Sequence, residues 1–227
     1  MAYQCHNFCN GEILSADQLN EIEQGLVALE ELLADHLYDP ITITAFTAKD
    51  TATGKNTLEI GSTVTNVAFA WSFSKTPQTI TLNGETIPVD STGTTLDVNV
   101  SGDTSWSLVA TDERGATSTK DTSVSFVNGV YYGALDYGTD IDSAVILGLT
   151  RKLQSGRSVS FTAGGGKRPT YALPTRYGTP TFKIGGFDYE WEKVKTFDFT
   201  NASGYTESYD VWMHSQNVTD SVTVNVT

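Results

Sequence analysis

Two cysteines and a histidine gather near the start of the chain, in the short segment CHNFC. Thiolates and imidazoles are ligands that zinc prefers, but a structural zinc site takes about four of them. One chain supplies only Cys5, His6 and Cys9. The segment therefore predicts either a metal shared between copies of the chain or, as we expect, reduced cysteines in a peptide that binds another protein. We expect no metal and no cofactor.

Five acidic residues form two groups in the C-terminal half, and paired carboxyls facing each other across a sugar are what a glycosidase needs. They are Asp136, Asp140, Asp142, Glu190 and Glu192. The first group has the composition of a turn, with Asp142 placed to cap a helix. Alternation along a strand puts Glu190 and Glu192 on the face opposite Trp191, where water solvates them. We therefore expect no enzyme.

Aromatic and arginine side chains gather around the glycine-rich loops of residues 163–192. Those that could contact a ligand are Arg168, Tyr171, Arg176, Tyr177, Tyr189 and Trp191. Aromatic rings beside polar groups hold glycans on lectin-like surfaces, and the same rings also fill the cores of β-domains. Both interpretations stay open for each residue. As a region, residues 163–192 predict the exposed tip, because loops lie at the surface.

A helix is predicted over residues 15–40, with a narrow apolar seam. Ser15 and Gln18 form a capping box at its start, and the Asp39-Pro40 pair ends it. Apolar residues recur in steps of three and four, the a/d spacing of a coiled coil, at Leu19, Ile22, Leu26, Leu29 and Leu33. No second helix of this length is predicted, so the seam is expected to pack against copies of itself.

The residues beside the seam favour a trimer. Residues 1–40 hold eight acidic residues and no Lys or Arg, so no salt bridge can form across the seam. Leu32 and Leu37 widen the apolar stripe, which favours more than two strands. We therefore expect a homotrimer rather than a dimer. The alternative is an amphipathic helix that lies on the chain's own β-domain.

Residues 41–127 predict a first β-domain. Six or seven short alternating segments occur with turn signals between them, and Asn83-Gly84 marks a tight hairpin. This spacing predicts an immunoglobulin-like sandwich with no disulfide, since the segment contains no cysteine. Trp71 is expected to anchor its core.

Residues 128–227 predict a second β-sandwich, the tip domain. It is interrupted by one short helix over residues 143–153, capped by Asp142, with Arg151 and Lys152 at the end. The whole chain is therefore predicted to be mainly β, with an N-terminal coiled-coil helix and two β-sandwich domains in an elongated homotrimer. Residues 1–14 remain as a separate docking peptide.

Charge and hydropathy exclude other classes. The net charge of -13 argues against nucleic acid, whose phosphates must be met by Lys and Arg. No apolar run reaches the length of a membrane span, so we expect no membrane insertion. The N-terminus lacks a basic region followed by an apolar one, which indicates no secretory signal. We therefore expect a protein made in a cytoplasm without an anchor.

The start of the chain resembles the N-terminal anchor of bacteriophage fibre and baseplate proteins, in which a short peptide leads into a helix. The matching residues are Gly11, Glu12, Ser15, Ala16, Leu19 and Asn20. The segments WSFSKTPQTITLNG and WSLVATDERGAT resemble immunoglobulin-like modules of phage structural proteins. The segments NGVYYG, YALPTRYGTPTFKIGGF and NASGYTESYDVW resemble C-terminal domains of the same group. The resemblance covers nearly the whole chain.

The resemblance implies a trimer in the virion, made in the host cytoplasm and anchored by its N-terminus. Residues 1–40 would bind capsid, collar or baseplate proteins, and the docking residues would be Tyr3, His6, Phe8, Gly11 and Glu12. The C-terminal tips would attach to a host-surface glycan or protein. The alternatives are a head fibre or capsid decoration without a receptor role, a polysaccharide depolymerase tip, and a bacterial adhesin or injection-system tip.

Overall fold

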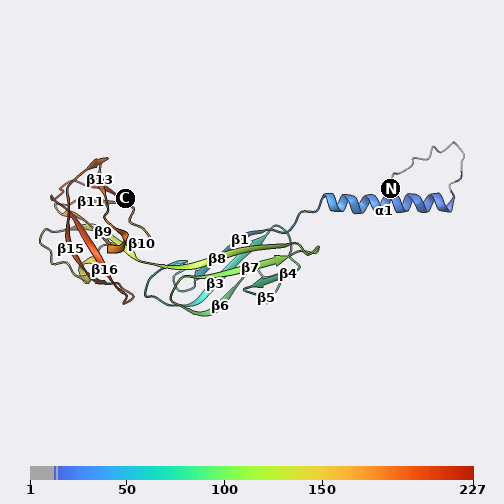
Figure 1. Cartoon of the computed structure of the whole chain (residues 1–227), viewed down its shortest axis with the longest axis horizontal. Coiled ribbons are helices and arrows are strands. Elements are labelled where there is room, and N and C mark those ends of the chain that lie inside the picture. Colours follow the sequence, from blue (N-terminus) through green and yellow to red (C-terminus); the bar gives the residue numbers. More distant parts are fainter. Residues whose placement is uncertain (1–12, 14) are drawn as a thin grey trace.

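The computed structural model describes residue 13 and residues 15–227, in which one helix and two β-domains follow one another along the long axis (Figure 1). The helix α1 (Ala16–His36) lies at one end and the C-terminal domain at the other. Strands make up most of the described chain after α1, so the protein is mainly β, as predicted.

The helix α1 begins where the sequence predicts. Ser15 N–H donates to Gln18 Oε1 (2.8 Å), and Gln18 N–H donates to Ser15 Oγ (3.2 Å), which completes the capping box. Leu37 caps the other end, and no residue of α1 is buried. The helix extends away from the β-domains, which contradicts the alternative that it lies on its own β-domain (Figure 1).

The first β-domain is a sandwich of two sheets. Its strands are β1 (Ile43–Asp50), β2 (Thr57–Glu59), β3 (Val64–Phe73), β4 (Thr79–Leu82), β5 (Glu85–Ile87), β6 (Gly93–Val100), β7 (Thr104–Thr111) and β8 (Thr117–Val127). One sheet has the order β1-β3-β6 and the other β2-β8-β7-β4-β5. The predicted hairpin joins β4 and β5, where Asn83 and Gly84 both have positive φ (50° and 87°).

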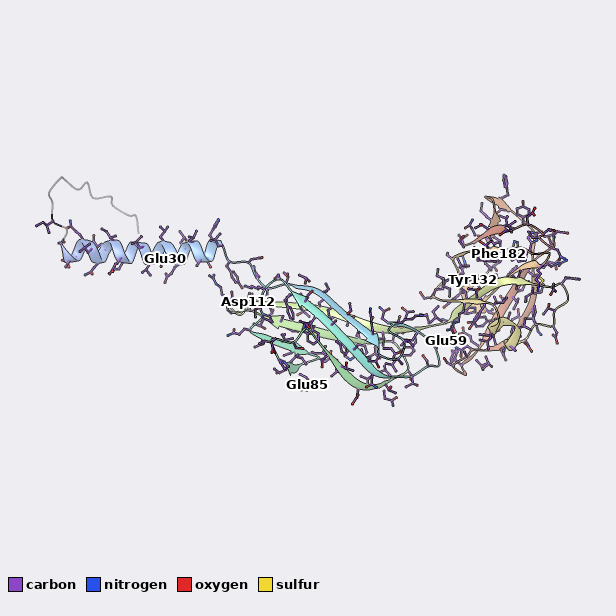
Figure 2. All side chains as sticks on the ribbon, turned by 180° about the vertical axis from the view of Figure 1, so that it is seen from behind. Glu30, Glu59, Glu85, Asp112, Tyr132 and Phe182 are labelled. Atoms are coloured by element: carbon purple, nitrogen blue, oxygen red, sulfur yellow. The ribbon has the colours of Figure 1, made fainter. Side chains whose placement is uncertain are left out.

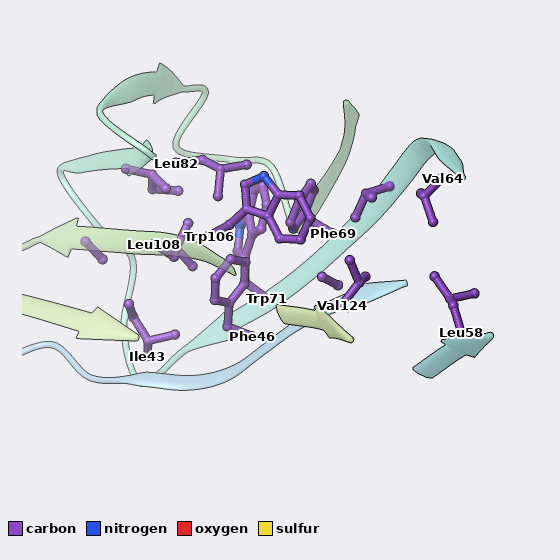
Figure 3. Packing of buried hydrophobic residues seen from close by; sticks show 14 of the residues in the cluster. Ile43, Phe46, Leu58, Val64, Phe69, Trp71, Leu82, Trp106, Leu108 and Val124 are labelled. Carbon is purple, nitrogen blue, oxygen red and sulfur yellow. The ribbon is translucent and has the colours of Figure 1, made fainter. Parts of the chain in front are cut away.

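Aromatic rings fill the core between these sheets (Figure 3). Phe69 packs edge-on against Trp106, with ring centroids 5.2 Å apart, and Phe46 lies beside both Phe69 and Trp71. Trp71 is buried, as predicted, and its indole N–H donates to the Ser91 carbonyl (2.8 Å). The bond satisfies the polar end of a ring that would otherwise lose its water.

The second β-domain is also a two-sheet sandwich. Its elements are β9 (Gly129–Leu135), α2 (Ser143–Leu147), β10 (Thr150–Leu153), β11 (Val159–Ala163), β12 (Arg168–Pro174), η1 (Thr175–Tyr177), β13 (Phe182–Ile184), β14 (Phe187–Asp188), β15 (Trp191–Thr200), β16 (Thr206–His214) and β17 (Val222–Val226). The sheets have the orders β10-β9-β12-β16-β15 and β11-β17-β13-β14.

The larger of these sheets is covered on both faces. Tyr171 and Leu173 pack toward the smaller sheet, whereas Ala172 packs in a separate core with Ile146 of α2. The central strand β12 is therefore buried almost throughout. Within the described residues, neither helix is both long and apolar enough to cross a membrane.

The predicted helix over residues 143–153 is wrong in its second half. Asp142 caps α2 by accepting a hydrogen bond from Val145 N–H (2.8 Å), as expected, but the helix ends at Leu147. Residues 150–153 instead form β10, which pairs with the edge of β9. Because that edge would otherwise be unpaired, strand pairing outweighs the local helix preference of this segment.

Candidate interaction surfaces

The predicted seam of α1 is a stripe of solvent-exposed apolar side chains. The exposed fractions are 49% for Leu19, 56% for Leu26, 59% for Leu29 and 55% for Leu33, and Ile22 is half-buried. At the C-terminal end, a shallow groove of ≈ 420 Å³ runs from the seam around one flank of the helix, and it is lined by Leu29, Leu32, Leu33, Asp35 and His36. Exposed apolar stripes of this kind mark interaction sites.

The base of α1 is fixed to the first sandwich through Asp112, a buried carboxylate in the turn after β7. The Tyr38 hydroxyl donates to Asp112 Oδ2 (2.6 Å), as does Ile41 N–H (3.1 Å), and Lys75 Nζ lies 3.1 Å from the same oxygen. Although burial alone would raise the pKa of Asp112, the hydrogen bonds from Tyr38 and Lys75 lower it below its ordinary range.

Arg114 makes a second contact with the end of α1. Its guanidinium donates to Asp35 Oδ1 (2.9 Å) and to the Ala34 carbonyl (3.0 Å), and it also covers the Tyr38 ring at 4.4 Å. Asp35 lies about 200° around the helix from Leu33, at about 100° per residue. The sandwich therefore holds α1 by the side opposite the seam and leaves the seam uncovered.

The rest of α1 carries only negative charge. Its exposed acidic residues are Asp17, Glu21, Glu23, Glu30, Glu31 and Asp35. Of these, Asp35 pairs with Arg114. The first four turns of the helix therefore present carboxylates beside the apolar seam, and their unpaired charge favours a basic partner surface.

The two sandwiches meet at Glu59, which is buried at the end of β2 between the domains (Figure 2). Its carboxylate accepts hydrogen bonds from Arg151 Nη1 (2.7 Å) and the Tyr131 hydroxyl (3.2 Å) of the second domain. Burial, followed by the charge of Glu59, raises the pKa of Tyr131 above its ordinary range. Beside this contact, Asn201 Nδ2 donates to the Ile60 carbonyl (2.8 Å).

The chain segment that connects the two sandwiches is a single residue. Only Asn128 separates β8 from β9, and it is 1% exposed. Its side-chain amide donates to Glu207 Oε2 (2.8 Å) of the second domain. The junction is thus a set of buried polar contacts rather than a flexible linker.

The six residues predicted for the tip do not form one site. Tyr171 is fully buried, and its hydroxyl donates to the Arg157 carbonyl (2.6 Å), so its prediction as a ligand contact is wrong. Tyr177 likewise donates inward, to the Gln154 carbonyl (2.9 Å). Both rings bury apolar area in the sandwich core, which outweighs any role at the surface.

The two predicted arginines have partners of their own. Arg176 Nε lies 2.5 Å from Glu207 Oε1, and the Arg168 guanidinium lies 3.9 Å from the centre of the Tyr137 ring. The rings of Tyr189 and Trp191 each lie 5.7 Å from the ring of His214. His214 was missed by the sequence analysis, since nothing local indicates that β15 and β16 pair there.

The acidic residues considered for catalysis make different contacts in the structure. Asp136 lies 3.1 Å from Lys167 Nζ, and Asp140 lies 3.7 Å from Lys195 Nζ. Asp142 caps α2, and Glu190 and Glu192 are exposed. Each of these carboxylates therefore makes a structural contact or is exposed to solvent.

The candidates for metal binding and docking lie outside the described residues. These are Tyr3, Cys5, His6, Phe8, Cys9, Gly11 and Glu12. In residue 13 and residues 15–227, no group of three or more His, Cys, Asp or Glu side chains is placed to hold a metal ion.

Comparison with known proteins gives a distant structural likeness to immunoglobulin domains. No protein-family model and no curated protein matches the chain. Among solved structures, the N-terminal eight Ig domains of Down Syndrome Cell Adhesion Molecule align with 76% of this chain at 11% identity and a TM-score of 0.24. The alignment covers 24% of the length of that structure. We infer nothing about function from it.

Proposed function

We propose that the chain is the subunit of a homotrimeric bacteriophage virion fibre. In this proposal, residues 1–40 dock to the particle, an immunoglobulin-like sandwich follows, and the C-terminal sandwich attaches to the host surface. The observation that carries the proposal is the apolar seam of α1: its four leucines are exposed, while the adjoining sandwich holds the helix from the opposite side.

The geometry at the base of α1 supports self-association through the seam. Burying an exposed leucine contributes about 2 kcal/mol, so five seam residues in each of three chains offset the cost of association. A helix of 21 residues is marginal by itself, and packing against copies would stabilise it. Because Arg114 binds the outer side of α1, three sandwiches can surround a central bundle of helices without covering the seams.

The charge of α1 supports docking to another virion protein. A bundle of three such helices would carry an entirely acidic outer surface over its first turns, which matches a basic socket. The resemblance of residues 11–20 to phage anchor segments supports the same role. Three C-terminal domains on one fibre would bind together, so that avidity strengthens attachment even where each single contact is weak.

The test is the solution mass of the full-length chain by light scattering. We expect three times the chain mass of 24.5 kDa. Leu26→Ser should reduce the mass to that of one chain, because it places a hydroxyl in the seam. Val27→Ser is the matched control, since Val27 is almost equally exposed (54% against 56%) but lies outside the seam.

A monomeric wild-type chain would refute the fibre. Equal effects of Leu26→Ser and Val27→Ser would show that the seam does not hold the assembly. Attachment to the particle is tested separately, by labelling virions with an antibody against the C-terminal domain and locating the label by electron microscopy. Label that never appears on particles would refute the virion role.

A further inference from the structure

Four buried side-chain nitrogens lack a hydrogen-bond partner within the described residues, and all belong to the C-terminal domain. They are Arg168 Nε, Trp191 Nε1, Trp212 Nε1 and His214 Nε2. Native proteins leave few such groups unpaired, because a buried donor without an acceptor loses its hydrogen bonds to water. Three of them come from one cluster, which we call the Trp191–Trp212–His214 cluster.

This cluster lies where β15 and β16 pair. Trp191 is directly opposite His214 in the register, and their rings are 5.7 Å apart and nearly perpendicular. Trp212 lies on the same face, two residues before His214. Phe182 stacks on Trp191 at 3.8 Å and lies 6.1 Å from Trp212, in the domain farthest from α1 (Figure 2).

The unpaired atoms are two donors and one nitrogen whose role depends on its tautomer. An indole nitrogen only donates. His214 is 5% exposed, and its Nδ1 lies 2.8 Å from the Gln216 carbonyl oxygen and 3.0 Å from the Gln216 backbone nitrogen. Nε2 carries the ring proton in one tautomer and accepts a hydrogen bond in the other. A hydroxyl group suits all three atoms, because it both donates and accepts.

One exposed aromatic ring lies beside these nitrogens, and a second is close to it in the sequence. Tyr189 is 50% exposed, with its ring 5.7 Å from that of His214, and Phe187 is 72% exposed in the same segment. The Gly185-Gly186 turn that precedes them has positive φ at both residues (60° and 87°) and holds them at the edge of the sandwich. Aromatic faces next to polar donors suit a ring with an apolar face and hydroxyl groups.

The surrounding charge favours a neutral ligand. Lys183 lies 3.6 Å from Asp188, and Lys193 lies 3.4 Å from Asp210 and 5.9 Å from the centre of the Trp212 ring, so a carboxylate balances the charge of each lysine. Glu190 and Glu192 are exposed next to Trp191 and add negative charge. An acidic sugar would be repelled here.

We infer that the Trp191–Trp212–His214 cluster is a subsite for a neutral saccharide. The sugar ring stacks on the aromatic side chains, its hydroxyl oxygens accept from the indole N–H groups, and a further hydroxyl forms a hydrogen bond with His214 Nε2. The half-exposed Tyr189 ring turns outward to admit it. This deepens the proposed attachment function, on which it rests, by naming a ligand class for the C-terminal domain.

The test is a sugar titration of the full-length chain labelled with 15N-tryptophan. The four indole signals separate the two domains, since Trp71 and Trp106 belong to the first sandwich and act as internal references. The probes are the methyl glycosides of glucose, galactose, mannose and rhamnose, and N-acetylglucosamine, with glucuronate as the acidic counterpart. We expect at least one neutral probe to shift Trp191 and Trp212 saturably, with a Kd on the order of 1 mM.

Trp191→Phe keeps the ring that stacks on Phe182 and removes its N–H, so we expect affinity to fall roughly tenfold, followed on the Trp212 signal. Tyr137→Ala is the control, because Tyr137 is also an exposed tyrosine but lies against Arg168.

No shift with any neutral probe, unchanged affinity in Trp191→Phe, or tighter binding of glucuronate would overturn the inference. Light scattering on the same sample distinguishes failure of the saccharide subsite from failure of the fibre proposal. A monomer that binds sugar refutes only the trimer. A trimer whose indole signals do not shift refutes only the subsite.

Discussion

Asp112 shows how one buried carboxylate can fix the direction of a helix. It accepts hydrogen bonds from Tyr38 and from the backbone N–H groups of Ile41, Arg114 and Ala116, so chain segments on both sides of the α1 base converge on it. A group of this kind stabilises the fold only in its charged form. Its contribution should therefore depend on pH.

The pKa of Asp112 is lowered in the folded chain, so its stabilisation is complete above the unfolded value of about 4 and is lost as the pH falls below it. We expect the melting temperature of the wild type to drop between pH 4 and pH 2 more steeply than that of Asp112→Asn, which should be less stable at pH 7. Thermal denaturation followed by circular dichroism measures both. Asp97→Asn, at an exposed position on β6, is the control. Parallel profiles for the wild type and Asp112→Asn would contradict the assignment.

Gly93 is a second residue whose identity the packing dictates. A Cβ atom there would lie 2.4 Å from the Phe69 carbonyl oxygen, which belongs to the paired strand and cannot move freely. We expect Gly93→Ala to destabilise the first sandwich by about 2 kcal/mol, as overpacking does. Gly102→Ala is the matched control, since nothing lies within 4 Å of its Cβ position. Chemical denaturation compares them, and equal midpoints would show that the strands can separate to make room.

At the scale of elements, α1 carries charges that a coiled coil would bring together. Glu23 and Glu30 occupy positions beside the seam, and α1 contains no Lys or Arg to offset them. We therefore expect added salt to stabilise the proposed trimer, because the Debye length falls from about 10 Å at 0.1 M to about 3 Å at 1 M. The helical circular dichroism signal of the full-length chain on heating measures this.

The double substitution Glu23→Gln with Glu30→Gln should remove most of the salt effect. Glu21→Gln should retain it, because Glu21 lies on the outer face of the same helix. A melting temperature that is independent of salt in the wild type would mean that these carboxylates do not approach one another.

The sequence predicts well those features that depend only on residues close together in the chain, such as helix caps and tight turns. The capping box of Ser15 and Gln18 and the Asn83-Gly84 hairpin form as expected, since each depends on residues within one turn. The end of α2 was not predictable in this way, because residues 150–153 form a strand that pairs with β9, which lies earlier in the chain. Tyr171 was misjudged for a similar reason: β12 is covered on both faces, so alternation along it carries no signal.

At the scale of the molecule, the orientation of the two sandwiches depends on Glu59. Removing its charge by Glu59→Gln leaves Arg151 without its partner at the junction, and we expect a loss of about 2 kcal/mol in the contact between the domains. Small-angle X-ray scattering should then show a wider distribution of maximum dimensions. Asp136→Asn removes an exposed ion pair within one domain and should leave the scattering unchanged. Identical scattering for Glu59→Gln and the wild type would assign the rigidity to Asn128 and Asn201 instead.

These long-range contacts are what the sequence could not indicate. Glu59 and Arg151 are 92 residues apart, and Tyr38 and Asp112 are 74 apart. Composition and spacing predicted two sandwiches behind a helix, but the side chains that join them are single polar residues in ordinary-looking segments. The same holds for the Trp191–Trp212–His214 cluster, which exists only through the pairing of β15 with β16.

The path of the chain through the first sandwich has a mechanical consequence. The chain enters β1 from α1 and leaves through β8 and Asn128 at the opposite end, so a pull along the long axis loads both strands lengthwise (Figure 1). β1 is paired along its length with β3, and β8 with β7. Force applied in this direction shears those ladders, and their hydrogen bonds must then break together rather than one after another. The sandwich between α1 and the C-terminal domain is thus arranged to resist unfolding under tension.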